Sequence, residues 1–295
     1  MNTYFTNFLA HLRSVRGLSE CTIENYTSAC SIFFEYCDSV DVESLAEVNQ
    51  QVVTDWIVFL YENGRQASSI NRYVSLLRNY FNWVIAFVPA MLEMENPCAA
   101  VKAMKQPKLL PKYIETKVLR EILDKMPESS FKELRSKAIL VVAWHCGLRR
   151  SEMLNLKVLD VNFNAKIIRV LGKGRKERFV PFFEECAAIL QRYMCARAHQ
   201  LQFASPWLFC TVSGDALNRQ QFRWIIQRIL LPHVPAELAH PHILRHSFAT
   251  MMMEKGVPIQ AISLVMGHAS IATTMRYLTI NEDFIRSQIG MAFGC

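Results

Sequence analysis

The chain has 295 residues, which is enough for two domains because a single core usually stops growing near ~250–300 residues. Its composition, 51% hydrophobic and 20% charged with only 10 Gly and 11 Pro, excludes a disordered chain and a small stapled scaffold. No apolar run approaches the ~20 residues of a membrane helix, and the first residues lack a secretory signal pattern. We therefore expect a folded cytoplasmic protein without membrane contacts.

The charged side chains are unevenly distributed, within a formal net charge of +7 at pH 7. Residues 1–105 carry 7 basic and 11 acidic side chains, whereas residues 106–295 carry 26 and 15. A basic C-terminal part fits a polyanionic partner such as nucleic acid, and it fits a solvated surface of mixed charge equally well.

The nine cysteines indicate a reducing compartment, since their number is odd and none falls in a Cys-x-x-Cys pair. Cys146 follows His145, but adjacent residues of one helix point about 100° apart, so we interpret Cys146 as a packing residue. The sequence contains no acidic metal cluster and no Gly-rich phosphate loop, so neither a metal nor a nucleotide is expected.

The first 90 residues predict a bundle of four amphipathic helices. Apolar residues recur at helical spacing within four segments, and turn signals at Gly17 and Asn63-Gly64 separate them. Serines open the second and fourth segments. The segments are 5–12, 19–37, 52–60 and 68–85.

A proline- and lysine-bearing stretch from residue 96 to 112 predicts a linker, which divides the chain into domains at 1–105 and 106–295. Beyond it we expect a helix near 116–126 and a long apolar helix through 138–146. Alternation over 166–170 and 178–181, around a basic tip with two glycines, predicts a β-hairpin.

Several polar residues then follow at informative spacing. His242 and Arg245 lie one helical turn apart, so both side chains can reach one point. A short helix over 258–266 should end at Gly267, directly before His268.

Four motifs together resemble the complete signature of the tyrosine recombinases, the phage-integrase superfamily. They are Gly147-Leu148-Arg149-x-Ser151-Glu152, the hairpin Lys173, the segment His242–Thr250, and Gly267-His268 ending at Tyr277. Residues 1–90 also resemble the family's four-helix core-binding domain, and the length is similar to its compact Xer-type members. Two departures are visible: Cys146 stands where Thr is usual, and Leu278-Thr279-Ile280 follows the tyrosine where Xer proteins commonly have Thr-His.

The resemblance implies a mainly α fold with one small β-hairpin or sheet, whose two domains form a clamp around DNA. It implies site-specific recombination, through a 3′-phosphotyrosyl intermediate and attack by the hydroxyl of a partner strand. The expected partners are double-stranded recombination sites and further copies of this chain, which form a tetramer through the C-terminal tail. A tetramer shared with a related recombinase is the alternative. No cofactor is implied, because the phosphotyrosine bond stores the energy.

Chemistry assigns a role to each residue at the motif positions. Tyr277 is the expected nucleophile, which attacks phosphorus and holds the phosphoryl group. The transition state places negative charge on the nonbridging oxygens, and Arg149 and Arg245 supply paired N–H donors that lysine would not replace equally.

The leaving 5′ oxygen needs a proton, which lysine can supply and arginine cannot. Lys173 is the expected general acid, and Lys176 is close enough to compete. His242 is expected to act as general base or phosphate donor, and His268 as phosphate donor. Glu152 should orient a neighbouring catalytic side chain.

We expect the helices at 19–37 and 68–85 to contribute to recognition of the DNA sequence, because their polar faces could contact base edges in a major groove. The alternative is that these polar faces are only exposed to solvent. The candidate residues are Asn25, Ser28, Asn71, Arg72, Ser75 and Arg78. Further residues are expected to be structural or to contact the DNA backbone: Arg150, Arg175, His246 and Arg276, and Lys176 joins them as a candidate DNA contact.

Two other functions stay open. A type IB topoisomerase-like enzyme would share the chemistry without strand exchange, and the compact two-domain length argues against it. A DNA-binding protein without catalysis would not need Tyr277, Lys173 and both arginines together.

Overall fold

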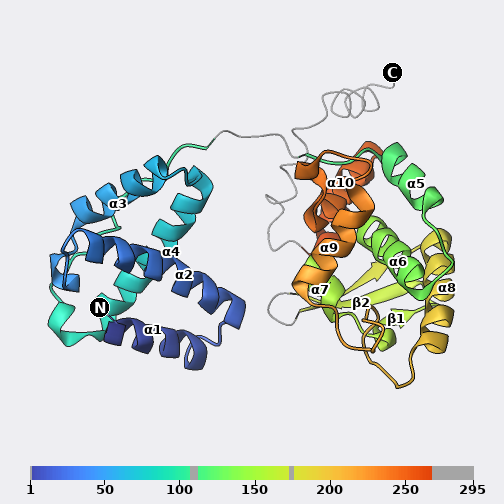
Figure 1. Cartoon of the computed structure of the whole chain (residues 1–295), viewed down its shortest axis with the longest axis horizontal. Helices are drawn as coiled ribbons and strands as arrows, with labels where there is room; N and C mark the ends of the chain where they lie inside the picture. The colour runs from blue at the N-terminus through green and yellow to red at the C-terminus, as the bar shows by residue number, and fades with distance from the viewer. Residues whose placement is uncertain (1, 107–111, 173–175, 268–295) are drawn as a thin grey trace. The chain divides into compact units, whose positions relative to one another are not determined.

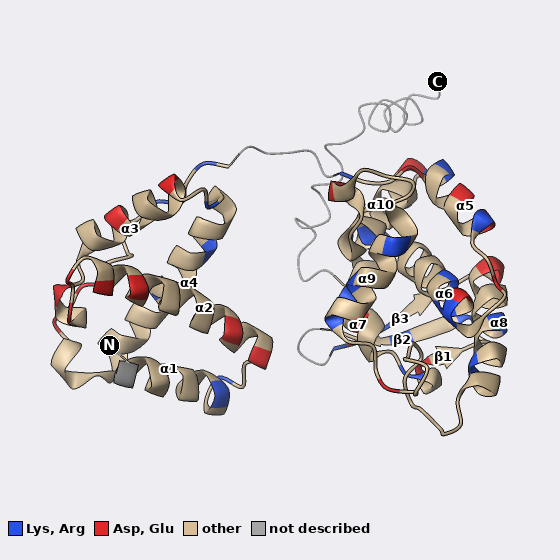
Figure 2. Ribbon diagram, viewed as in Figure 1, with Lys and Arg blue, Asp and Glu red and all other residues tan. Residues whose placement is uncertain are grey.

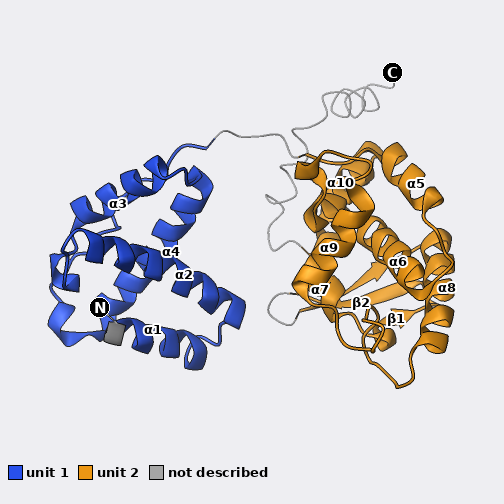
Figure 3. Cartoon of the chain, in the orientation of Figure 1, with its two compact units in different colours: residues 1–108 blue, residues 109–295 orange. Residues whose placement is uncertain are grey.

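The computed structural model describes residues 2–106, 112–172 and 176–267 (Figure 1). In these ranges the chain is mainly helical with one small three-stranded sheet, so the expected fold class is confirmed. The chain forms two compact units, residues 1–108 and 109–295 (Figure 3). Within the part of the chain described, no helix is both long and apolar enough to cross a membrane.

Unit 1 contains the four helices expected from periodicity. They are α1 (Asn2–Ser14), α2 (Glu20–Ser39), α3 (Gln50–Glu62) and α4 (Ala67–Phe87). Short 3-10 helices at Leu45–Glu47 and Pro89–Met91 add to them. Fully buried aromatic rings form the centre of the core, and Phe33 meets Trp56 edge-on with ring centroids 5.0 Å apart.

The first part of the predicted linker packs on unit 1. Arg78 on α4 donates to the carbonyls of Cys98 at 3.0 Å and Val101 at 2.9 Å. Asn71, also on α4, exchanges two hydrogen bonds with the backbone of Met104, at 3.0 and 2.8 Å. Because these side chains satisfy its backbone and Cys98 is fully buried, the segment up to Met104 is part of unit 1.

Unit 2 surrounds a buried helix. The described elements are α5 (Thr116–Lys125), α6 (Phe131–Cys146), α7 (Arg150–Asn155), β1 (Val161–Asn162), β2 (Ile167–Leu171), β3 (Glu177–Pro181), α8 (Glu184–Gln200), α9 (Arg219–Leu230), α10 (Pro241–Glu254) and α11 (Ile259–Met266). Short 3-10 helices lie at Val158–Asp160 and Ala236–Leu238. Ser130 and Glu133 begin α6 with a capping box, and its residues 138–142 are fully buried.

The predicted hairpin is present as β2 and β3, and β1 extends it to a sheet in the order β1-β2-β3, antiparallel throughout. Ile168 pairs with Val180 and both are buried, which sets the register. Strand β1 has only two residues, too few for an alternating pattern in the sequence. Where the described part of the hairpin ends, Gly172 N–H donates to Lys176 O at 2.8 Å.

Candidate active site

A tight turn after α6 determines the position of Arg149. Gly147 ends α6 with a φ of 59°, and a Cβ there would lie 2.4 Å from the Phe248 ring on α10. Leu148 is buried, and Arg149 is the N-cap residue of α7. The glycine therefore allows the chain to leave the buried helix and present Arg149 close to α10.

Arg245 reaches the same place from α10, where Pro241 occupies the first helical position. Its side chain is only 5% exposed and donates to Gly147 O and Met266 O, each at 2.6 Å. Arg149 donates to Gly267 O at 2.5 Å. The two guanidinium groups thus donate to successive carbonyls at the C-terminal end of α11.

Glu152 is a buried carboxylate held by two arginines. It accepts from Arg149 N and Arg149 Nη1, both at 2.8 Å, and from Arg178 Nη1 and Nη2, both at 2.8 Å. Burial alone would raise the pKa of Glu152, but the hydrogen bonds from Arg178 and Arg149 outweigh it and hold the pKa below its ordinary value. Glu152 therefore has the contacts of a carboxylate that orients Arg149.

Arg178 on β3 completes this network and was not among the site residues expected from the motifs. The signal was present in the strand pattern, because Arg178 lies on the same face as the buried Val180. A charged side chain on the buried face of a strand needs a partner, and Glu152 is that partner.

His242 lies one turn before Arg245, in the first turn of α10. Burial lowers the pKa of its imidazole, and the nearby charges of Arg150, Arg245 and Arg149, together with His240, lower it further. The neutral form is therefore favoured at neutral pH, and a neutral imidazole can accept a proton.

Cys146 is fully buried in the α6 core. A hydrogen bond with Cys186 and burial raise the pKa of its thiol well above the ordinary value. Such a thiol is not a nucleophile at neutral pH, which agrees with its interpretation as a packing residue. Among the residues described, no group of three or more His, Cys, Asp or Glu is arranged to hold a metal ion.

The structure brings together Arg149, Glu152, His242 and Arg245. Four other predicted site residues lie outside the described residues, namely Lys173, Arg175, His268 and Tyr277, as does Arg276. Their described neighbours Gly172, Lys176 and Gly267 lie at the ends of β2, β3 and α11. Figure 2 marks Lys and Arg positions on α7, β3, α9 and α10, among other elements.

The candidate DNA-reading residues of unit 1 have different surroundings. Arg72 is largely exposed; it donates to Asn25 Oδ1 at 3.3 Å and lies over the Tyr73 ring. Asn71 and Arg78, by contrast, hold the segment up to Met104. DNA reading by any of these residues stays a prediction.

Comparison with known proteins identifies the family. Residues 112–283 match the phage integrase family, and residues 5–86 match the N-terminal SAM-like domain of phage integrases. The first match alone spans more than half of the chain. The chain belongs to the phage integrase family.

Curated relatives agree with this assignment. Tyrosine recombinase XerC of Staphylococcus epidermidis is 26% identical over 279 residues, covering 95% of this chain and 93% of the relative. XerC of Staphylococcus aureus is 27% identical over 286 residues, covering 97% and 95%. The tyrosine recombinase function expected from the motifs is therefore confirmed: this family member is a DNA breaking-rejoining enzyme.

A solved structure shows the same fold. The XerH site-specific recombinase, bound to a palindromic difH substrate after cleavage, superposes with a TM-score of 0.76 at 21% identity. The match covers 97% of this chain and 83% of XerH.

Proposed function

We propose that this phage integrase family member exchanges strands between two double-stranded DNA sites, with Tyr277 as nucleophile. The observation that carries the proposal is the convergence of Arg149 and Arg245 on the end of α11, beside a neutral His242. Two fixed guanidinium groups and a proton acceptor are what phosphoryl transfer without a metal requires.

The chemical step balances with these residues. The Tyr277 phenol, with an ordinary pKa near ~10, loses its proton to His242 as its oxygen bonds to phosphorus. Arg149, Arg245 and His268 hold the nonbridging oxygens. The bond from phosphorus to the 5′ oxygen breaks, and Lys173 protonates that oxygen. The 5′ hydroxyl of a partner strand then attacks the phosphotyrosine and gives its proton to the neutral Lys173. The bond from phosphorus to Tyr277 breaks, and His242 returns the proton to the phenol oxygen.

Two assays test this function. Incubation with a nicked duplex should trap a covalent protein–DNA adduct, and a DNA-binding protein without catalysis would give none. A substrate carrying two sites should yield recombinant product. Relaxation of supercoiled DNA without recombinants would favour the topoisomerase-like alternative.

DNA reading by unit 1 is proposed to depend on Arg72. We expect Arg72→Ala to weaken binding to a duplex that the parent protein selects from a random library by about 1–3 kcal/mol, and to weaken binding to a scrambled duplex less. Titrations with both duplexes measure the difference. Equal weakening on both would mean that Arg72 contacts phosphates.

Arg78→Ala is the matched comparison. Because Arg78 holds Cys98 O and Val101 O, this variant should lower the melting temperature of the protein. An unchanged melting temperature together with lost sequence preference would show that Arg78 reads DNA.

We further propose that the tail joins the subunits of a tetramer on paired sites. The tail contains an apolar set that is costly to expose: Phe284, Ile285, Ile289, Met291 and Phe293. Family resemblance favours cyclic exchange, in which each tail fills a pocket on the next protomer.

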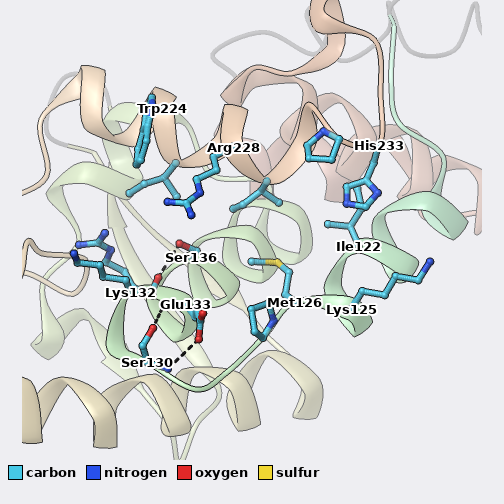
Figure 4. Close-up of a pocket in the computed structure, with 15 residues that line it drawn as sticks. Ile122, Lys125, Met126, Ser130, Lys132, Glu133, Ser136, Trp224, Arg228 and His233 are labelled. Carbon is cyan, nitrogen blue, oxygen red and sulfur yellow. Dashed lines mark hydrogen bonds between the residues drawn. The ribbon is translucent and has the colours of Figure 1, made fainter.

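A pocket of about 420 Å³ on unit 2 fits such a segment (Figure 4). Apolar side chains from α5, α9 and the loop after α5 line it, among them Ile122, Met126 and Ile229. Its basic side chains also suit the acidic Glu282-Asp283 that precedes the apolar set. These basic residues are Lys125, Lys132, Arg135 and Arg228.

Removal of residues 284–295 should leave single-site DNA binding nearly unchanged, abolish assembly of paired sites and impair cleavage. Gel-shift and cleavage assays measure these effects. Ile229→Glu in the full-length chain should likewise abolish assembly, whereas Leu159→Glu, at an exposed position outside the pocket, should not. Unfolding of the truncated protein, or recombination at the parent rate, would contradict tail exchange.

A further inference from the structure

Three arginines donate to three successive carbonyls at the end of α11. Arg178 Nε donates to Val265 O at 2.7 Å, Arg245 to Met266 O at 2.6 Å, and Arg149 to Gly267 O at 2.5 Å. The C-terminal carbonyls of a helix lack intrahelical partners and carry partial negative charge, so they suit cations. Arg149 and Arg245 have proposed roles at the phosphate, and Arg178 has none.

The contacts of Arg178 join three parts of the proposed active site. Its side chain is 14% exposed and makes a bidentate ion pair with Glu152, which in turn holds Arg149. Its Nε donates to Val265 O near the end of α11, three residues before His268 in the sequence. Its own strand, β3, pairs with β2, and Lys173 lies in the sequence between these two strands.

The residues next to Lys173 and His268 lie close to this ion pair. A Cβ added at Gly172 would lie 3.7 Å from Arg178 Nη1 and 4.0 Å from Glu152 Oε1. A Cβ at Gly267 would lie only 3.0 Å from the guanidinium carbon of Arg178. Both chain segments therefore pass the Arg178–Glu152 pair immediately before a predicted catalytic residue.

We propose that Arg178 is a positioning residue, which couples the general-acid hairpin to the phosphate-binding arginines through Glu152 and the end of α11. The inference rests on the proposed function. One guanidinium group satisfies a carboxylate and a helix-end carbonyl at once, so a shift of β3 is transmitted to both. Placement of Lys173 and orientation of Arg149 then depend on the same side chain.

The proposal gives a pH dependence specific to this ion pair. Glu152 faces Arg149, the N-cap residue of α7, and Arg178 on β3. The charged groups that line a pocket with it are Lys157, Asp160, Arg169 and Glu177, of which Asp160 and Glu177 pair with Arg169. Without Arg178 the buried carboxylate loses its bidentate partner, so its pKa rises and it protonates on acidification. Arg149 would then lose its anchor.

The test compares single-turnover cleavage by Arg178→Met, Arg178→Lys and the parent protein. We expect Arg178→Met to cleave a nicked duplex roughly 10–100-fold more slowly, as when a supporting hydrogen bond to a catalytic group is lost, with unchanged DNA affinity. Arg178→Lys keeps the charge without the planar fork and should fall between Arg178→Met and the parent.

A duplex whose 5′ leaving oxygen is replaced by sulfur reports on the hairpin. A thiolate leaves without a proton, so a misplaced general acid no longer slows cleavage of this substrate. With it, Arg178→Met should recover most of the cleavage rate that it lost relative to the parent, whereas Arg149→Lys should recover none. The rate at which Arg178→Met cleaves the ordinary duplex should also decrease as the pH is lowered. In the double variant Arg178→Met/Glu152→Gln, position 152 no longer titrates, so the cleavage rate should no longer decrease at acidic pH.

Three outcomes would overturn the inference. The first is cleavage at the parent rate by both Arg178 variants. The second is slow cleavage by Arg178→Met that the sulfur-substituted duplex does not speed up. The third is a pH profile of cleavage by Arg178→Met that equals the parent's. The proposed function fails separately, if the parent protein forms no covalent adduct that requires Tyr277.

Discussion

Tyr277→Phe is expected to abolish the covalent protein–DNA adduct while DNA affinity stays within about twofold of the parent. The change removes one oxygen and little surface, so contacts to the duplex are kept. Without that oxygen no bond to phosphorus can form, and Arg149 and Arg245 cannot replace a missing nucleophile. Denaturing gels of protein incubated with nicked duplex measure the adduct, and gel shifts measure affinity.

Tyr61→Phe is the matched control, because Tyr61 is a largely exposed tyrosine on α3 of unit 1. It should form adduct at the parent rate. An adduct that persists in Tyr277→Phe would assign the nucleophile to another residue.

Arg245→Lys is expected to slow cleavage by roughly 10²–10³-fold, the scale seen when one fixed transition-state donor is lost. In the structure this buried guanidinium donates to Gly147 O and Met266 O at once. A lysine ammonium is a single point of charge, so it cannot span both carbonyls and also present paired donors to a phosphate. Single-turnover cleavage of saturating nicked duplex measures the loss.

The control for charge-preserving replacement is Arg192→Lys, which alters a partly exposed ion pair with Glu128. Because such pairs contribute about 0–1 kcal/mol, its cleavage rate should stay at the parent value. Cleavage by Arg245→Lys within a factor of two of the parent would show that Arg245 does not bridge the phosphate. Melting temperatures of both variants separate lost folding from lost catalysis.

Local patterns in the sequence were sufficient for the secondary structure near the site. The helices of unit 1, the hairpin of β2 and β3, and the end of α11 at Gly267 follow from periodicity and turn residues, which act within a few positions. The motifs around Arg149 and Arg245 could be recognised in the sequence for the same reason, because each is a short contiguous segment. The sequence also determined the family, because several such runs occur in order.

Only the tertiary structure decided how those runs meet. Arg178 is 26 residues from Glu152 and 87 from Val265, and Arg149 is 118 residues from Gly267. Hydrogen bonds between residues so far apart in the chain produce no periodic pattern in the sequence. Neither the contacts of Arg178 nor the packing of Cys98 and Val101 on α4 could therefore be predicted. Both arise because a buried arginine or an unpaired carbonyl must find a partner, and chain folding determines which partner is near.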